Sequence, residues 1–257
     1  MQIVTLTSDW QNDGLYIGPF KGSLLHHTKN VNVVDICHTI KYKDIAMAAF
    51  VLKHTAPMYP DKTIHVSITG TESNADVLVL SSNNQWFITS DNGLAGLLFE
   101  NEPELIYKIS NAFSNSHPSF PELELLIPPV VHLIQNSLDT LNCVRTTSYK
   151  RKLAFLPTYD ENTIIGHVSY IDANGNIISN ITKNLFSMVG KNRNYRIYIK
   201  SKNYVVNEII REYHSVDQGD LFALFSFTQL LEIGIKDGRL SDILAIDYDT
   251  SIRVNFL

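Results

Sequence analysis

Short apolar runs alternate with segments of helical spacing through the first half of the chain. Strands are expected at residues 3–6, 31–37, 63–69, 77–81 and 85–89. Helical spacing occurs at residues 15–27, 43–54, 94–99 and 130–138. Strands that alternate with helices in this way indicate an α/β fold with a mainly parallel central sheet. The stretch between residues 101 and 129 is rich in proline and reads as a long irregular loop.

The pattern changes after a polar stretch at residues 146–162, where we expect a domain boundary. Short β-type runs follow at residues 163–171, 176–181, 195–199, 204–206, 221–227, 230–235 and 252–256. Asn174-Gly175 and Asp237-Gly238 are hairpin signals. The sequence therefore predicts two domains, an N-terminal α/β domain over residues 1–155 and a smaller C-terminal all-β barrel over residues 163–257.

Composition narrows the class of protein. The 257 residues carry a formal net charge of −5 without a basic block, so no nucleic-acid partner is expected. Cys37 and Cys143 lack the spacing of metal ligands and are interpreted as buried free thiols. The chain begins with a strand instead of a signal peptide, and no apolar run approaches the roughly 20 residues of a membrane span. We expect a cytoplasmic protein without a membrane partner and without a bound metal.

Asp9 is the first candidate for ligand chemistry, because it directly follows the first predicted strand. Ligands of open α/β sheets bind beyond the carboxyl ends of the strands. A carboxylate at that place can accept hydrogen bonds from a sugar diol. The alternative is that Asp9 or Asp13 caps the next helix, and from these residues alone the cap is favoured.

Several sequence blocks occur in an order that identifies a family. They are SDWQ at 8–11, YIG at 16–18, FKG at 20–22, VDICHTI at 34–40, DI at 44–45, AAF at 48–50, SDNGL at 90–94, YIDANGN at 170–176, SNI at 179–181 and LEIG at 231–234. Together they resemble the S-adenosyl-L-methionine (SAM) hydroxide adenosyltransferases. These are adenosine-forming SAM hydrolases related to the fluorinase and chlorinase enzymes.

The resemblance implies a homotrimer in which each subunit pairs an α/β domain with a β-barrel. SAM would lie between the α/β domain of one subunit and the barrel of its neighbour, as a substrate, with no separate cofactor. The implied reaction converts SAM and water to adenosine and L-methionine by attack at the ribose C5′. The expected partner is therefore an adenosyl ligand, either SAM or adenosine.

The resemblance also assigns roles to individual residues. Asp9 corresponds to the aspartate that binds the ribose hydroxyls, and Asn176 to the asparagine that contacts the adenine. Asp172 falls near the carboxylate that meets the methionine ammonium. Trp10 replaces a phenylalanine and packs either on the ligand or on the core. The turn at the methionine end corresponds to Ser226, Phe227 and Thr228.

The chain departs from the family at the residues that orient or deprotonate the attacking water, which are an aspartate, an arginine and a histidine. The block that holds the aspartate is two residues shorter here, and no arginine follows it. In the histidine block, Pro121 takes the place of the histidine. A proton acceptor is still needed for hydroxide chemistry. The carboxylates nearby in the sequence are Glu72, Asp76, Glu122 and Glu124, each of which is otherwise a solvated loop charge.

These departures leave alternative functions open. The first is a SAM hydrolase with an altered catalytic set, and the second is a pseudoenzyme that binds SAM or adenosine without turnover. A purely structural trimer with a collapsed pocket is the third. Thr69-Gly70-Thr71 resembles the loop of the halogenases, which are a further alternative, although the tyrosine that precedes that loop in halogenases has no counterpart here. Thr69 and Thr71 are accordingly candidate ligand contacts.

Overall fold

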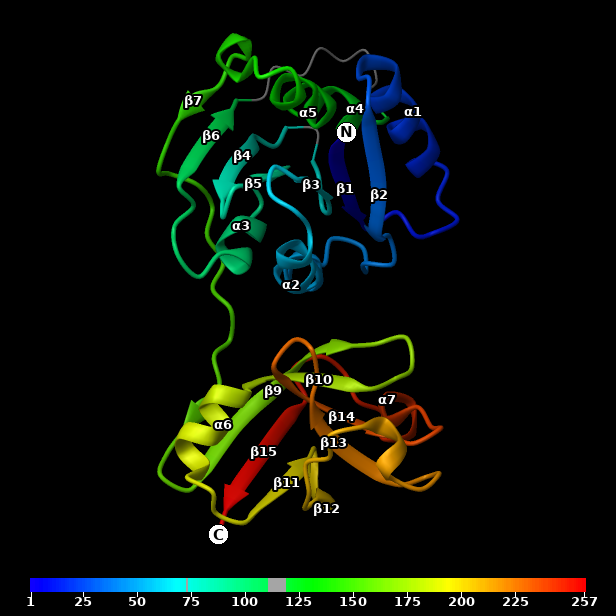
Figure 1. Ribbon diagram of the computed structural model, residues 1–257, viewed down its shortest axis with the longest axis vertical. Helices are drawn as coiled ribbons and strands as arrows, with labels where there is room; N and C mark the ends of the chain where they lie inside the picture. The colour runs from blue at the N-terminus through cyan, green and yellow to red at the C-terminus, as the bar shows by residue number, and fades with distance from the viewer. Residues whose placement is uncertain (73, 111–118) are drawn as a thin grey trace. The chain divides into compact units, whose positions relative to one another are not determined.

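The computed structural model describes residues 1–72, 74–110 and 119–257 (Figure 1). The chain divides into two compact units, Met1–Ala154 and Phe155–Leu257. Each unit is built on a sheet of its own. No described helix is long and apolar enough to cross a membrane.

The sheet of the first unit has the strand order β2-β1-β3-β5-β4-β6-β7. Its strands are β1 (Gln2–Ser8), β2 (Val31–Cys37), β3 (Ile64–Ile68), β4 (Val77–Ser82), β5 (Gln85–Ser90), β6 (Leu105–Ile109) and β7 (Val144–Arg145). β1 runs parallel to β2 and β3, and β3 runs parallel to β5. β4 is antiparallel to both of its neighbours. The sheet is thus mainly parallel, as the sequence pattern predicted.

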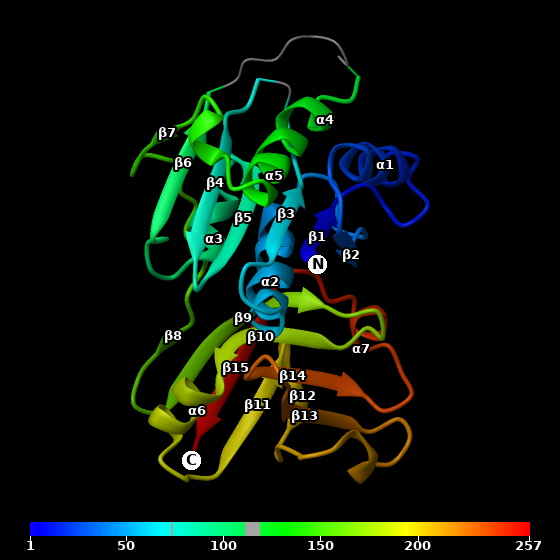
Figure 2. The same ribbon diagram turned by 45° about the horizontal axis from the view of Figure 1, so that its top comes forward.

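Helices cover both faces of this sheet (Figures 1 and 2). They are α1 (Ile17–His27), α2 (Ile45–Thr55), η1 (Ala56–Met58), α3 (Leu94–Leu98), α4 (Glu122–Leu125), α5 (Ile127–Ile134) and η2 (Leu138–Thr140). α1, α4 and α5 lie on one face, and α2 and α3 on the other. Phe20 of α1 and Val130 of α5 are fully buried with Leu6 of β1, so burial of apolar surface fixes the first layer.

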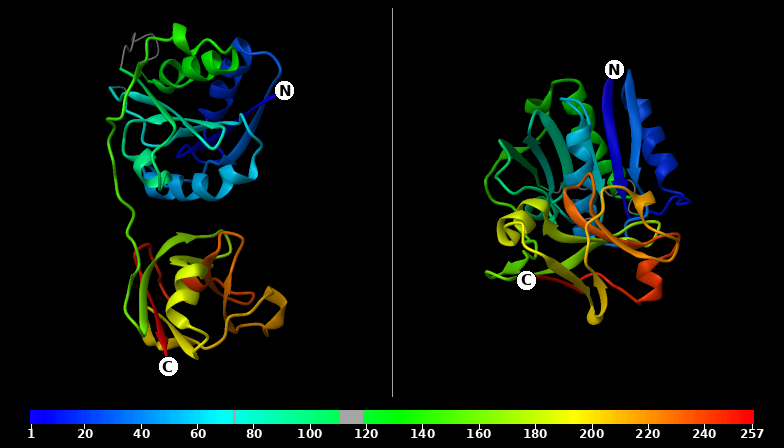
Figure 3. Two further views of the ribbon diagram at one scale, coloured as in Figure 1. Left: turned by 60° about the vertical axis from the view of Figure 1, so that its left-hand side comes forward. Right: turned by 60° about the horizontal axis from the view of Figure 1, so that its bottom comes forward.

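The second unit is a nearly closed, barrel-like antiparallel sheet (Figure 3). Its path is β12-β11-β15-β9-β10-β14-β13, and β8 pairs with β9. The strands are β8 (Thr158–Tyr159), β9 (Thr163–Ile171), β10 (Ile177–Thr182), β11 (Tyr195–Ile199), β12 (Ser201–Val206), β13 (Leu221–Phe225), β14 (Leu230–Ile235) and β15 (Ser251–Phe256). The helices are α6 (Lys183–Gly190), η3 (Tyr213–Ser215) and α7 (Leu240–Ile243).

Both predicted hairpin turns form, and the first of them joins two strands of the sheet. Gly175 has φ +78°, and the turn joins the antiparallel strands β9 and β10. A Cβ atom at Gly175 would also lie 2.9 Å from the Cβ of Arg239, so the position requires glycine for two reasons. The second turn also forms, with φ 56° at Asp237, an antiparallel bridge between Ile235 and Gly238, and a hydrogen bond from Gly238 N to the carbonyl of Ile235 at 3.1 Å. The chain then continues into α7, so this turn does not lead into a second strand.

Three predictions need correction. β6 lies within the stretch that was expected to be irregular, while residues 111–118 of that stretch lie outside the described residues. α6 is a helix within the part that was expected to be all-β, and Thr182 caps it by accepting a hydrogen bond from Leu185 N at 3.1 Å. Neither Cys37 nor Cys143 forms a disulfide, as expected, but each is partly exposed and not buried.

Candidate functional site

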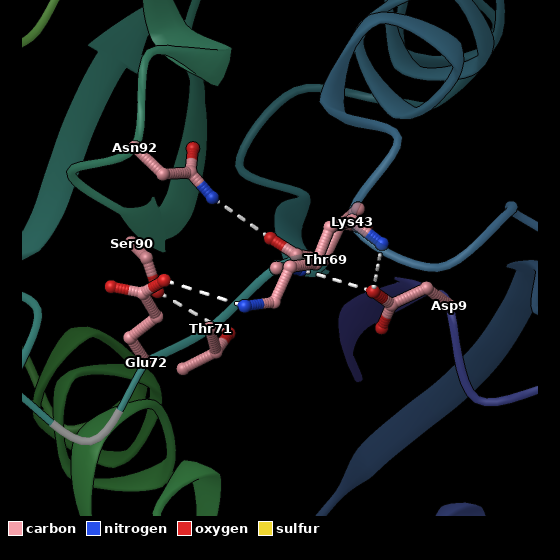
Figure 4. A network of polar contacts seen from close by, with 8 residues as sticks. Asp9, Lys43, Thr69, Thr71, Glu72, Ser90 and Asn92 are labelled. Carbon is pink, nitrogen blue, oxygen red and sulfur yellow. Dashed lines mark hydrogen bonds and ion pairs between the residues drawn. The ribbon is translucent and has the colours of Figure 1, made fainter.

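The loops that follow β1, β3 and β5 meet at one edge of the first sheet, because these strands are parallel (Figure 4). Asp9 follows β1, Thr69 and Gly70 follow β3, and Asn92 follows β5. The loop between β2 and α2 adds Lys43. This is the edge at which the sequence predicted a ligand.

Asp9 ties two of these loops together. Its Oδ2 atom accepts hydrogen bonds from the backbone N–H of Lys43 at 2.8 Å and of Gly70 at 3.1 Å. Neither Asp9 nor Asp13 caps α1, since the N-cap residue is Tyr16 and no side chain caps that end. The helix-cap prediction is therefore wrong. In the described part of the chain no hydrogen bond reaches Asp9 Oδ1, so this oxygen remains as an acceptor.

The backbone of the loop after β3 is held by the side chain of Asn92, from the loop after β5. Asn92 donates from Nδ2 to the carbonyl of Thr69 at 2.8 Å and accepts from Leu94 N at 3.1 Å. Gly70 adopts φ +59°, a conformation that costs other residues energy. This conformation is the one in which its N–H reaches Asp9.

The two threonines that flank Gly70 have different surroundings. Thr69 is fully buried, and its hydroxyl lies 3.5 Å from Ser67 Oγ. Thr71 is partly exposed and accepts from Ser90 Oγ at 3.3 Å. Thr71 is therefore the more accessible of the two predicted ligand contacts.

Glu72 forms a surface ion pair. Its Oε1 atom lies 3.4 Å from Lys43 Nζ, and the two side chains are 62% and 47% exposed. The hydrogen bond that Lys43 donates to Glu72 raises the pKa of Lys43 above its ordinary value. Exposed pairs of this kind add little stability, so the contact orients Glu72 without burying it.

Trp10 belongs to an aromatic cluster of the first unit. Its ring centroid lies 5.4 Å from that of Phe120, 5.8 Å from that of Phe20 and 6.0 Å from that of Tyr16. Aromatic pairs favour such tilted and edge-on contacts. The sequence left open whether Trp10 packs on the ligand or on the core. In the structure it packs on the core, against the buried rings of Phe20 and Phe120.

Glu122 begins α4, next to this cluster. Burial raises the pKa of its carboxyl, and the negative charge of Asp9 raises it further. The carboxylates of Glu122 and Asp9 are thus electrostatic neighbours although 113 positions separate them, from 9 to 122. Glu124 lies on the same helix but at a different angle around its axis.

A second polar cluster lies in the second unit, at the turn between β9 and β10. Asp172 Oδ1 accepts from the backbone N–H of Asn174 and of Asn176, each at 2.8 Å. The side-chain Nδ2 of Asn176 donates to Asp172 Oδ2 at 3.1 Å. The structure therefore brings together the residues predicted for the ammonium and the adenine.

Glu232 on β14 is the buried centre of this cluster. Its Oε1 atom accepts from Tyr213 OH at 2.8 Å and lies 3.5 Å from Asn176 Nδ2. The pKa of Glu232 is raised, chiefly by burial and also by the charge of Asp172, while the hydrogen bonds of Tyr213 and Ser226 lower it. Tyr213 was not predicted from the sequence, and Glu232 was noted only as part of the LEIG block.

The turn between β13 and β14 carries the remaining predicted residues. Ser226 Oγ and Thr228 Oγ1 lie 2.9 Å apart, and Thr228 also accepts from Leu230 N at 3.2 Å. The side chain of Phe227 is 67% exposed. Ser226 joins the Glu232 cluster through its hydrogen bond, whereas Phe227 points to solvent. No group of three or more metal-ligating side chains occurs among the residues described.

Family models match both parts of the chain. The SAM hydroxide adenosyltransferase N-terminal domain matches residues 4–142, and the C-terminal domain of the same family matches residues 166–253. The chain belongs to the SAM hydroxide adenosyltransferase family. A similar curated protein is the (R)-S-adenosyl-L-methionine hydrolase of Methanocaldococcus jannaschii. It is 25% identical over 268 residues, which cover 99% of this chain and 96% of that protein.

Two solved structures share the fold. An uncharacterized conserved protein from Thermotoga maritima superposes with a TM-score of 0.86 at 23% identity and covers 99% of this chain and 100% of that one. A conserved hypothetical protein from Thermus thermophilus gives a TM-score of 0.76 at 19% identity with the same coverage. At 19–23% identity, this structural similarity shows a shared fold.

Proposed function

We propose that the protein hydrolyses SAM to adenosine and L-methionine. The observation that carries the proposal is the match of both family domains along the chain, together with the free acceptor oxygen of Asp9. The related hydrolase from Methanocaldococcus jannaschii supports the same reaction. The protein's SAM-facing residues would come from both units, and no resident cofactor or metal takes part.

Asp9 is the proposed ribose ligand. Oδ2 is held by two backbone N–H groups, which fix the plane of the carboxylate before any ligand arrives. Oδ1 would then accept hydrogen bonds from the ribose hydroxyls. Trp10 follows Asp9 in the sequence, and Thr69 and Thr71 flank Gly70, whose N–H binds Asp9. All three are proposed as further contacts of the adenosyl group, with Trp10 acting through the aromatic cluster.

The C-terminal cluster is the proposed site for the two ends of SAM. Asn176 would contact the adenine, and Asp172 the methionine ammonium. The hydroxyls of Ser226 and Thr228 are proposed for the methionine carboxylate, with Phe227 beside them. The contact of Asn176 with both Asp172 and Glu232 supports these roles, because the amide is oriented in advance.

The reaction needs little activation of the leaving group, because the sulfonium of SAM is already a good one. Positioning of water in line with the C5′–S bond and its removal from bulk solvent are the main requirements. A proton acceptor contributes about 10²–10⁴-fold. The test is incubation of the purified protein with SAM, followed by chromatography and mass spectrometry. Adenosine and methionine should accumulate in equal amounts and in proportion to protein.

Binding without turnover is the second candidate function. The absence of the family's water-activating aspartate, arginine and histidine favours this function. The clearest case is Pro121, which stands in place of the histidine. Intact SAM that is recovered from the protein after denaturation, without adenosine, would support binding alone. A protein that neither retains nor cleaves SAM would contradict both functions.

We also propose a cytoplasmic homotrimer with ligand sites between subunits, and domain limits of 1–155 and 163–257. The division of the chain into two units supports the limits. Light scattering coupled to size-exclusion chromatography should give a mass near three times the 29.1 kDa of one chain. A monomer mass at every concentration would contradict the trimer.

A further inference from the structure

The carboxylates near the missing catalytic set differ in their surroundings. Glu72 is 62% exposed and pairs with Lys43 on the surface. Glu122 is partly buried and interacts with Asp9, the proposed ribose ligand. The structure therefore separates two candidates that the sequence left equivalent.

The packing of neighbouring residues fixes the position of Glu122. Phe120 lies two residues earlier, is 9% exposed, and its ring centroid is 5.4 Å from that of Trp10 and 5.0 Å from that of Tyr16. Leu125 at the end of α4 is 8% exposed and belongs to the same apolar core. Both flanks of Glu122 are thus anchored, one of them against the residue that follows Asp9.

Glu124 is the internal comparison. Residues two positions apart on a helix point about 200° away from each other around its axis, since each residue turns the helix by about 100°. Asp9 is a cause of the raised pKa of Glu122, after burial. Glu122 and Glu124 therefore point to different sides of α4, and the charge of Asp9 acts on the pKa of Glu122.

We propose that Glu122 is the catalytic base that accepts a proton from the attacking water. The proposal rests on the proposed SAM hydrolysis and deepens it. It gives this chain a carboxylate in place of the family's water-activating residues, directly after Pro121. Asp9 would then bind the ribose hydroxyls, and Glu122 would face the water at C5′.

Hydrolysis of SAM needs no reactant besides water. The water oxygen forms a bond to C5′ as the C5′–S bond breaks, and the electron pair of that bond stays on sulfur. The sulfonium becomes the neutral thioether of methionine. One proton of the water passes to the Glu122 carboxylate and is later released to solvent. The products are adenosine, methionine and one proton.

The environment of Glu122 suits this role. A base is most effective when its pKa lies near the working pH, and burial together with Asp9 moves the carboxyl in that direction. Asp9 is the charged group from another segment whose field acts on Glu122 in the described structure. The turnover rate should therefore fall as the pH drops below the pKa of Glu122, because the protonated carboxyl cannot accept the proton.

The test compares Glu122→Gln with Glu124→Gln in the full-length protein. Glu122→Gln should lower kcat for adenosine release by about 10²–10⁴-fold and should abolish the acidic limb of the pH profile. Its Kd for SAM, measured by calorimetry, should stay within about threefold of the wild type. Glu124→Gln should retain the activity, the affinity and the pH profile of the wild type.

A chemical-rescue measurement separates loss of the base from loss of structure. Glu122→Ala should regain adenosine release when formate is added, because a small carboxylate can occupy the vacated space. Wild-type activity in Glu122→Gln would overturn the role of Glu122 while leaving SAM hydrolysis intact. Equal loss in Glu124→Gln, or no formate response in a folded Glu122→Ala, would also overturn it. Absence of adenosine with the wild-type protein would instead contradict the proposed function itself.

Discussion

Asp9 Oδ2 accepts a hydrogen bond from the backbone N–H of Gly70 at 3.1 Å. The contact joins the loop after β1 to the loop after β3, across 61 positions of sequence. The same oxygen accepts from Lys43 N at 2.8 Å, which adds the loop after β2. A single carboxylate oxygen thus links three loops at this edge of the sheet.

Replacement of Asp9 by alanine should lower both stability and affinity. Two backbone N–H groups lose a charged acceptor, which costs about 2 kcal/mol or more of unfolding free energy. Urea unfolding measures this loss. Binding of SAM or adenosine should weaken by at least tenfold in calorimetry, or about 1.4 kcal/mol. Unchanged affinity in Asp9→Ala would contradict the role of Asp9 as the ribose ligand.

Gly70→Ala should destabilise the first unit through its backbone alone. The new Cβ would lie 3.5 Å from the Cα of Lys43, which is an ordinary contact, but φ +59° costs an L-residue about 1–2 kcal/mol. Gly22→Ala is the matched control, because Gly22 lies inside α1 and its Cβ would meet nothing within 4 Å. The control should stabilise the protein by roughly 0.5–1 kcal/mol. Thermal or urea unfolding that ranked the two variants in the opposite order would exclude this account.

The fold was largely predictable because the strands of both units carry the periodicity of buried or half-buried sheets. β2 occupies the predicted residues 31–37, and the parallel arrangement followed from alternation with helices. β6 was missed because its five residues stand in a stretch whose prolines and polar residues read as one loop. α6 was missed because short β-type runs surround it. Thr182 is nevertheless a suitable N-cap, and the buried Phe186 occupies a core position of the helix.

The sequence named candidate residues for the site but did not give their contacts. The motif blocks named Asp9, Asp172 and Asn176, and the cluster around Asn176 arises locally in the hairpin turn. The backbone donors to Asp9 come from loops that are distant in sequence, and no local pattern encodes such contacts. The same reason explains why Glu122 could not be separated from the other carboxylates before its tertiary neighbours were known.

Acid should destabilise the first unit through His65. This side chain is 1% exposed, its Nδ1 lies 2.7 Å from Thr5 Oγ1, and burial lowers its pKa from 6.5 to about 4. Because the folded pKa is below the unfolded one, the stability contribution is complete above about pH 6.5 and is lost as the pH falls toward 4. The whole pKa shift of His65 contributes about 3 kcal/mol to the free energy of unfolding, since each pKa unit corresponds to about 1.4 kcal/mol.

A double variant isolates this effect. Thr5→Val with His65→Leu removes both hydrogen-bonding partners at once and leaves no polar atom of the pair unsatisfied. The fall in unfolding free energy between pH 7 and pH 4 should be smaller than in the wild type, while the contribution of His54, whose pKa burial also lowers to about 4, persists. An identical pH dependence in the two proteins would rule out His65 as a source of acid sensitivity.

Asn176→Ala should weaken binding of adenosyl ligands by about tenfold or more. The change removes the amide that Asp172 and Glu232 orient, and leaves Tyr213 to satisfy Glu232. Asn174→Ala is the control, since Asn174 reaches Asp172 through its backbone N–H. Calorimetric titration with SAM and with adenosine should show loss of affinity in the first variant only. Equal affinities would remove Asn176 from the proposed adenine site.

If the protein hydrolyses SAM, a water oxygen becomes bonded to C5′. Incubation with SAM in water enriched in the heavy isotope of oxygen, followed by mass spectrometry of both products, shows where that oxygen goes. We expect adenosine with the heavy oxygen at C5′ and methionine without label, because the C5′–S bond is the one that breaks. SAM recovered intact, or adenosine that carries no label, would contradict enzymatic hydrolysis at C5′.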